Sequence, residues 1–203
     1  MAYFPFFVDL TDKSGLIVGG GAVAARKVEK LLPYGPQITV VAPDLCREIT
    51  ETAGLVCLRR PFRAEDLAGQ TFVIAATDRP EENRRIAKLC REKNIPVNVV
   101  DDREACTFLF PALVRRGSLS VGISTGGSSP TAAVYVKEQI QSLLPDDLES
   151  TLLWLESHRE QVRTAVPEEK RGKAFADLFA RCLESGCPTE EELESILEEV
   201  CHE

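Results

Sequence analysis

The sequence predicts an α/β protein whose core is a parallel sheet covered by helices on both faces. Short apolar segments without strict alternation recur through the N-terminal half, which is typical of strands buried on both sides. Segments with helical spacing separate them, and such crossovers join parallel strands. A glycine-rich turn follows the first clear strand, at residues 19–21. Together these observations favour a doubly wound sheet, in which ligands bind where the strands end.

The expected elements follow one another in a regular order. An apolar stretch at residues 4–10, interpreted as a short strand or a packed extended arm, precedes the sheet. Strands are expected at residues 15–18, 38–41, 56–60, 71–76 and 97–100, and helices at residues 23–32, 46–52 and 81–93, with a turn or short helix at 64–67. The prolines and glycine at residues 33–36 end the first helix.

The rest of the chain has a different pattern. Two strands are expected at residues 107–111 and 119–124, followed by a loop at 124–130 and a helix to about residue 144. From residue 148 onward the pattern is helical, with interruptions near Pro167 and at residues 186–188. Thr189 and Glu192 resemble a capping box, which predicts the start of the last helix.

The glycine turn has the pattern G-x-G-x-x-A, with Gly19, Gly21 and Ala24 at the small positions. Gly19 permits the tight turn, Gly21 lets a pyrophosphate approach the backbone, and Ala24 lets the helix pack on the strand. The N–H groups that begin this helix point towards the phosphates. We therefore predict a Rossmann-type domain that binds NAD; a plain strand–turn–helix connection is the alternative. The predicted cofactor contacts of the turn are Gly19, Gly20, Gly21, Ala22 and Val23.

Polar residues follow two further strands and lie within a third. Asp44 comes after the second strand, where an acidic residue usually holds the ribose hydroxyls, although a cap of the next short helix is its alternative role. No arginine directly follows this strand, so NAD is favoured over NADP. Thr77 and Asp78 are predicted to contact the nicotinamide half of NAD, with a helix cap as the alternative for Asp78. Asn98 is either a cofactor contact or a structural hydrogen-bonding residue.

The chain is expected to form three parts: an NAD-binding Rossmann domain at residues 1–112, a small dimerisation segment at 113–146 and a C-terminal helical domain at 147–203. Residues 108–144 combine two strands with a helix that has several apolar positions. A segment of this size buries little surface alone, so a second copy is expected to cover it. We therefore predict a homodimer.

Composition argues against several classes of function. The chain has 203 residues and a net charge of −8, which does not suit a nucleic-acid-binding protein. No apolar run approaches the roughly 20 residues of a membrane span, and residues 1–9 lack a secretory pattern, so a cytoplasmic protein is expected. The seven cysteines include no C-x-x-C pair and there are only two histidines, so we expect reduced thiols and no metal site.

Five segments together resemble the precorrin-2 dehydrogenase family, which also forms the front part of sirohaem synthases. The matching segments are residues 4–10, 15–27, 75–78, 97–101 and 124–130. The resemblance implies oxidation of precorrin-2 to sirohydrochlorin with NAD⁺, in sirohaem biosynthesis. It also implies that the family's functional aspartate is Asp101 and that residues 124–130 belong to the tetrapyrrole site. The substrate contacts expected from it are Ser124, Thr125, Gly126, Gly127 and Ser128.

Asp101 has a chemical interpretation of its own. It follows the last predicted strand of the sheet, where its carboxylate could accept a proton while a hydride leaves the substrate. Its alternative role is to cap a turn together with Asp102. The loop at 124–130 also has an alternative interpretation, as a tight glycine turn that leads into a capped helix starting at Pro130.

Two other functions are compatible with the sequence. One is a bifunctional enzyme that also inserts Fe²⁺ into sirohydrochlorin. The other is a non-catalytic regulatory domain that senses NAD, because a Rossmann fold alone does not specify chemistry. A sensor has no need for a carboxylate beside the nicotinamide, so Asp101 and the loop at 124–130 are the features that favour an enzyme.

Overall fold

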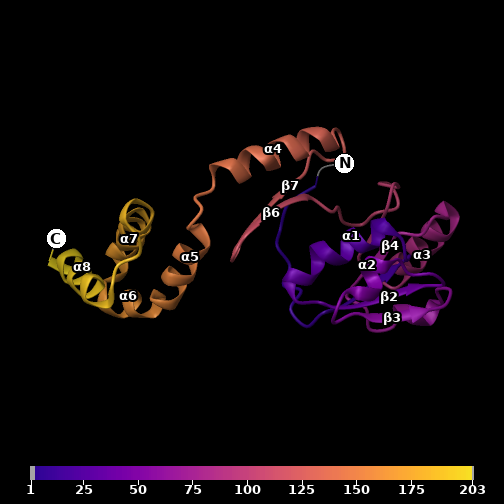
Figure 1. The fold of residues 1–203 in the computed structure, drawn as a ribbon, viewed down its shortest axis with the longest axis horizontal. Coiled ribbons are helices and arrows are strands. Elements are labelled where there is room, and N and C mark those ends of the chain that lie inside the picture. The colour runs from indigo at the N-terminus through magenta and orange to yellow at the C-terminus, as the bar shows by residue number, and fades with distance from the viewer. Residues whose placement is uncertain (1–2, 203) are drawn as a thin grey trace. The chain divides into compact units, whose positions relative to one another are not determined.

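The computed structural model describes the backbone of residues 3–202 and the side chains of residues 3–200 (Figure 1). The chain divides into two compact units, Met1–Phe110 and Pro111–Glu203. The sequence-based boundaries at residues 112 and 146 stay predictions. Within the described residues, no helix is both long enough and apolar enough to cross a membrane.

The first unit is built on a five-stranded parallel sheet, which confirms the expected fold class. Its strands are β1 (Ser14–Val18), β2 (Gln37–Ala42), β3 (Val56–Arg59), β4 (Phe72–Ala75) and β5 (Val97–Val99), in the order β3-β2-β1-β4-β5. Val18 is in register with Val41 on one side and with Ala75 on the other. The loops after β1, β2 and β4 therefore leave the sheet at the same level, where the strand order reverses and a doubly wound sheet binds its ligand.

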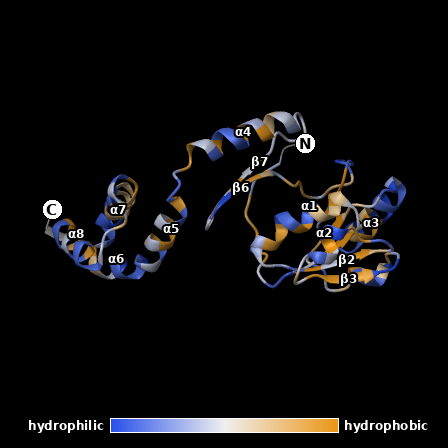
Figure 2. Ribbon diagram, viewed as in Figure 1, coloured by the Kyte–Doolittle hydropathy of each residue, from blue (hydrophilic) through white to orange (hydrophobic). Residues whose placement is uncertain are grey.

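Helices cover both faces of this sheet. They are α1 (Ala22–Leu31), α2 (Arg47–Glu51) and α3 (Pro80–Glu92), with short 3₁₀ turns η1 (Leu32–Tyr34) and η2 (Ala64–Leu67). Leu16 belongs to the apolar cluster that α3 covers, whereas its neighbour Ile17 belongs to the cluster that α1 covers. Because alternate residues of one strand enter different cores, the strands read as continuous apolar segments. Figure 2 shows this concentration of hydrophobic residues on the strands.

Two expectations for the first unit are corrected. Residues 4–10 form no strand, and the arm is not packed as expected, because the side chains of Phe4, Phe6 and Phe7 are all at least 74% exposed. Residues 107–111 are not a strand either. Phe108 and Phe110 pack against the core of the first unit, so their apolar pattern reflects a packed irregular segment.

The second unit begins with an antiparallel hairpin of β6 (Ala112–Arg116) and β7 (Leu119–Ile123). Gly117 takes a positive φ of 55° at its turn. The helix α4 (Pro130–Leu143) packs on β6, and α5 (Leu148–Ser157), α6 (Arg159–Ala165), η3 (Glu168–Lys170), α7 (Arg171–Ser185) and α8 (Glu190–His202) follow. The capping box at the start of α8 is confirmed, because the N–H of Thr189 donates to Glu192 Oε2 at 2.9 Å and the N–H of Glu192 to Thr189 Oγ1 at 3.3 Å.

Candidate functional site

Gly19 brings the end of β1 against the end of β4. Its φ of 131° is a conformation that side chains rarely adopt, and a Cβ at this position would overlap the carbonyl oxygen of Ala76. Its N–H donates to the carbonyl of Val41 at 3.0 Å. Gly19 therefore ties together the ends of three strands, and only glycine fits the backbone there.

Gly20 makes a second close contact, with the loop after β2. A Cβ on Gly20 would overlap the backbone carbonyl oxygen of Asp44. The carbonyl of Gly20 in turn accepts a hydrogen bond of 2.7 Å from the N–H of Cys46. The glycine turn and the Asp44 loop are thus held against each other by the backbone.

Gly21 differs from both neighbours because a Cβ there would meet nothing within 4 Å. It is the N-cap residue of α1, and no side chain caps the helix. Gly21 and Ala22 are exposed, so the first N–H groups of the helix face open space. A pyrophosphate fits here, because it would fill that space and accept hydrogen bonds from those N–H groups.

Asp44 is exposed immediately after β2 and does not cap α2. The N-cap residue of α2 is Cys46, and no side chain makes the cap bond, so the alternative role expected for Asp44 is wrong. Arg47 is engaged elsewhere, because its Nε donates to Glu51 at 2.7 Å. Contact of Asp44 with a ribose stays a prediction.

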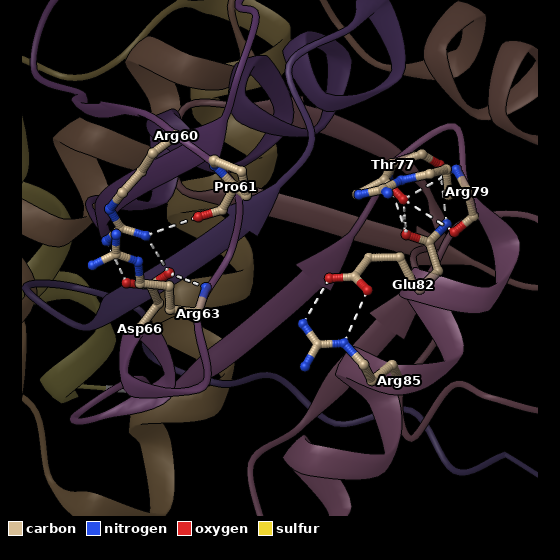
Figure 3. A network of polar contacts seen from close by, with 9 residues as sticks. Arg60, Pro61, Arg63, Asp66, Thr77, Arg79, Glu82 and Arg85 are labelled. Atoms are coloured by element: carbon tan, nitrogen blue, oxygen red, sulfur yellow. Dashed lines mark hydrogen bonds and ion pairs between the residues drawn. The ribbon is translucent and has the colours of Figure 1, made fainter.

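Thr77 is fixed by a buried asparagine that the sequence analysis did not single out. Thr77 Oγ1 donates to Asn83 Oδ1 at 2.7 Å, and Asn83 Nδ2 donates to the carbonyl of Thr77 at 3.0 Å. The N–H of Arg79 also donates to the Thr77 hydroxyl, as Figure 3 shows. The N-cap residue of α3 is Arg79, and no side chain makes a cap bond there. Asp78 is exposed and does not cap the helix, so the alternative role expected for Asp78 is wrong.

Asn98 has the structural role that was one of its two interpretations. It is buried in β5, and its Nδ2 donates to the carbonyl of Phe108 at 3.0 Å. This bond ties β5 to the packed segment that ends the first unit. A contact between Asn98 and the cofactor stays a prediction.

The two aspartates after β5 have different environments. Asp102 accepts hydrogen bonds from Arg84 Nε at 2.8 Å and from the N–H of Ala105 at 3.2 Å. The bond from Arg84 and that backbone bond hold the pKa of Asp102 below its usual value. Asp101 is exposed, has a φ of 59°, and accepts no side-chain hydrogen bond within the described part of the chain. Of the two carboxylates, Asp101 is therefore the one that a ligand can use.

The loop that presents Asp101 is closed by the thiol of Cys106. The N–H of Val99 donates to Cys106 Sγ at 3.1 Å, and the thiol donates to the carbonyl of Asp102 at 3.3 Å. Burial raises the pKa of this thiol. Cys106 is therefore a neutral structural group that holds both ends of the loop.

Lys27 is a partly buried charged residue of the first unit that the sequence analysis did not identify. It lies on α1 directly before the buried Val28, and its Nζ is 4.0 Å from the centre of the Phe110 ring. Burial, followed by the charge of Lys30, lowers the pKa of Lys27 to about 8, while Asp101 is among the groups that raise it. The signal in the sequence was a lysine next to the core face of a helix.

The loop at 124–130 belongs to the second unit and is a glycine turn that leads into a capped helix. Gly126 and Gly127 have positive φ values of 62° and 87°. Ser129 caps α4, because its hydroxyl accepts the N–H of Ala132 at 3.1 Å. Thr125 Oγ1 bonds across the loop to the carbonyl of Ser129 at 3.0 Å. Ser124, Gly127 and Ser128 are exposed. Their contact with a substrate stays a prediction.

The parallel sheet, the glycine turn and the open start of α1 define a dinucleotide-binding Rossmann domain. Residues 6–112 match the family described as "Putative NAD(P)-binding", and residues 116–143 match the one described as "Sirohaem biosynthesis protein central". The chain belongs to the family of precorrin-2 dehydrogenases and the N-terminal parts of sirohaem synthases, which confirms the resemblance. NAD is the cofactor of its first unit.

Relatives of known name match the chain over most of its length, across both units. "Siroheme synthase" proteins of Thioalkalivibrio sulfidiphilus and Methylococcus capsulatus are 38% and 40% identical over 86% of this chain. That of Neisseria meningitidis is 36% identical over 98% of it. The chain spans only 36%, 38% and 44% of these relatives' own lengths, respectively. The solved structure "SirC, precorrin-2 dehydrogenase" matches with a TM-score of 0.74 and 25% identity, over 98% of each chain.

Proposed function

We propose that this protein oxidises precorrin-2 to sirohydrochlorin with NAD⁺. The observation that supports this function most directly is the placement of an exposed carboxylate, Asp101, after β5 of a sheet whose glycine turn suits a dinucleotide. The similarity to the solved precorrin-2 dehydrogenase SirC, which extends over nearly the whole chain, supports the same assignment.

The reaction removes a hydride and a proton from the substrate. When bound, NAD⁺ supplies the acceptor for the hydride. The N–H groups at the start of α1 hold its pyrophosphate, and Asp44 bonds its ribose. Asp101 takes the proton on a carboxylate oxygen and releases it to water, so the enzyme returns to its starting charge. Thr77 and Asp78 line the nicotinamide half of the crevice, with Thr77 already fixed by Asn83.

The substrate is a macrocycle with several carboxylates, and the loop at 124–128 suits its recognition. Ser124 and Ser128 present exposed hydroxyls, and Gly126 and Gly127 let the backbone approach a ligand closely. We therefore assign the substrate contacts to Ser124, Thr125 and Ser128 together with these glycines. Metal insertion is not part of this proposal, because no observation on the described residues favours it: they contain no group of three or more His, Cys, Asp or Glu placed to hold a metal ion.

We also propose that the protein is a homodimer joined through α4. Val134, Tyr135, Val136 and Leu143 of this helix are between 41% and 79% exposed, an unusual amount of apolar surface for one helix. A second copy would cover it. Light scattering should give twice the 22.4 kDa of one chain. A monomer mass at micromolar concentration would contradict this proposal.

The activity is tested with purified protein, NAD⁺ and precorrin-2 under anaerobic conditions, because the substrate oxidises in air. The expected result is formation of sirohydrochlorin and NADH in equal amounts, followed by absorbance. A protein that binds NAD⁺ but leaves precorrin-2 unchanged would support the alternative of a sensor. Fe²⁺ added to sirohydrochlorin, in a separate assay, decides whether the chain also inserts metal.

A further inference from the structure

Helix α3 holds the two loops that follow β4 and β5, and it does so through consecutive residues. Asn83 binds the loop after β4, because its Oδ1 accepts the N–H and the hydroxyl of Thr77 at 3.1 and 2.7 Å. The next residue, Arg84, binds the loop after β5, because its Nε donates to Asp102 Oδ2 at 2.8 Å. Since β4 and β5 are parallel neighbours, both loops leave the carboxyl edge of the sheet, where a doubly wound sheet binds its ligand.

The loop after β5 has a second attachment to the same helix. Arg91 Nη2 donates to the carbonyl of Glu104 at 2.7 Å. Because Arg84 and Arg91 are seven residues apart, they lie on one side of α3. Within the loop, the other carboxylate oxygen of Asp102 accepts the N–H of Ala105 at 3.2 Å. The Asp102 carboxylate thus joins the helix to the far side of its own loop.

Asp101 lies directly before this anchored residue and has an unusual backbone conformation. Its φ of 59° is in the left-handed region, which a residue with a side chain keeps where the surrounding contacts fix it. On one side of Asp101, the N–H of Val100 donates to the carbonyl of Ala75 at 3.0 Å. On the other side, Asp102 is bound by Arg84. The backbone that carries the Asp101 side chain is therefore held at both of its neighbours.

We propose that Arg84 is a positioning residue for Asp101: its bond to Asp102 holds the loop after β5 in the conformation that presents the Asp101 carboxylate to the substrate. This inference rests on the proposed function, in which Asp101 accepts the proton. Arg84 acts through Asp102 and takes no part in the proton transfer. A general base has to lie within hydrogen-bond reach of the proton that it removes, so a loosened loop lowers turnover although Asp101 itself is intact.

The ion pair has a local effect rather than a global one. The side chain of Arg84 is 68% exposed, and exposed ion pairs add little to the free energy of unfolding. Replacement of Arg84 should therefore leave the midpoint of thermal unfolding nearly unchanged. Arg85 offers a matched control on the same helix, because its Nε and Nη2 donate to Glu82 of α3, at 2.9 and 2.8 Å, and not to a loop (Figure 3).

Amide hydrogen exchange of the free protein measures the anchoring without cofactor or substrate. Arg84→Met keeps a long side chain without the charge. In this variant, exchange within residues 100–106 should become up to about fivefold faster, the upper range for loss of an exposed ion pair. In Arg85→Met, exchange within the same residues should equal that of the unmodified protein. Unchanged exchange in Arg84→Met would overturn the proposal, because the loop would then be held without Arg84.

Turnover of precorrin-2 tests the link to Asp101. Arg84→Met should lower kcat about tenfold, less than loss of Asp101 itself, while the dissociation constant of NAD⁺ stays unchanged. Arg84→Lys should restore most of kcat, because the pair uses a single bond from Nε and an ammonium group can also supply one. Arg85→Met should have the kcat of the unmodified enzyme.

A double-mutant cycle shows whether Arg84 acts through Asp102. Asp102→Asn should lower kcat by a similar factor to Arg84→Met. The protein with both substitutions should be no slower than the slower single variant, since each substitution removes the same bond. If the two effects multiply instead, Arg84 acts by another route and the proposal is contradicted.

These results separate the inference from the proposed function. If the protein does not oxidise precorrin-2, the proposed function fails, and hydrogen exchange alone decides whether Arg84 fixes the loop. If the protein is active and Arg84→Met combines faster exchange with a normal kcat, anchoring of the loop does not matter for the reaction and the inference is wrong.

Discussion

The backbone carbonyl of Asp44 occupies the position that a side chain on Gly20 would need. The two loops that should enclose the dinucleotide are therefore packed against each other through main-chain atoms. Gly21, one residue later, has open space where a side chain would stand. Neighbouring glycines in one motif thus serve different purposes, since Gly20 allows the loops to close and Gly21 leaves room for a ligand.

Alanine substitutions should separate these two purposes. Gly20→Ala has to displace the Asp44 loop and should destabilise the free protein by about 1–3 kcal/mol, the usual scale for overpacking. Gly21→Ala meets no protein atom and should change stability by less than about 1 kcal/mol, yet weaken NAD⁺ binding. Thermal unfolding and titration calorimetry measure the two effects. Undiminished NAD⁺ affinity in Gly21→Ala would contradict the assigned position of the pyrophosphate.

Asp44 should decide the choice of cofactor. Its carboxylate is expected to accept hydrogen bonds from the adenosine ribose and to repel a 2′-phosphate, so NAD⁺ should bind more tightly than NADP⁺. Asp44→Ala should lower NAD⁺ affinity about tenfold, which is the scale of one hydrogen bond to a charged group. It should also narrow the preference for NAD⁺ over NADP⁺. Arg59→Ala, at the end of the neighbouring strand β3, is the control and should leave NAD⁺ affinity unchanged. Equal or tighter NADP⁺ binding by the unmodified protein would show that Asp44 does not have this role.

Asp101 and Asp102 should respond differently to the same substitution. Asp101→Asn should lower turnover by roughly 100-fold or more, the scale for loss of a general base, with NAD⁺ affinity unchanged. Asparagine tolerates the positive φ of 59° at this position, so the fold should persist. Asp102→Asn loses the ion pair with Arg84 and should reduce turnover less. Anaerobic assays of both variants compare them, and near-normal turnover in Asp101→Asn would move proton transfer to water or another group.

The pair of Arg60 and Asp66 should make stability depend on pH. Arg60 Nη1 donates to Asp66 Oδ2 at 2.8 Å, and the N–H of Arg63 donates to the same oxygen, as Figure 3 shows. The bond from Arg60 holds the pKa of Asp66 below its usual value. The contribution of this pair to the free energy of unfolding is therefore complete above the unfolded-state pKa of about 3.9. It is lost as pH falls through the lower pKa that Asp66 has in the folded state.

Denaturant unfolding of Asp66→Asn tests that dependence. At pH 7 the variant should be less stable by about 1–3 kcal/mol, and the difference should shrink as pH falls below the ordinary range of a carboxyl pKa and the native carboxylate also becomes protonated. Glu51→Gln, in the exposed pair with Arg47, is the control and should change stability by less than about 1 kcal/mol. A difference that is constant between pH 7 and pH 3 would show that Asp66 acts without its charge.

Local sequence patterns predicted the sheet of the first unit well. Strands such as β1 are buried on both faces, so their apolar runs are unambiguous. Gly19 and Gly20, between β1 and α1, are required by close backbone contacts that the glycine pattern specifies. The segment at 107–111 was mistaken for a strand because Phe108 and Phe110 are apolar for another reason, namely packing on the core. Burial alone does not distinguish a strand from a packed irregular segment.

The site was predicted less completely than the fold. Asp101 was proposed because its position after a strand is visible in the sequence and the family resemblance points to it, and its role stays a prediction. Asn83 and Lys27 were missed because their roles depend on partners elsewhere in the fold: Asn83 reaches back to Thr77, and Lys27 meets Phe110 from far along the chain. Such contacts leave no periodic signal, and only the assembled fold shows them.

The bonds between Thr77 and Asn83 have a consequence for the thermodynamics of cofactor binding. The loop after β4 has already lost its conformational freedom in the free protein, because both its backbone and its hydroxyl are committed to a buried side chain. A dinucleotide that reaches this loop does not have to order it, so that part of the entropic penalty of association falls on folding instead. Removal of Asn83 would return the penalty to the binding step, with weaker affinity and a more unfavourable binding entropy.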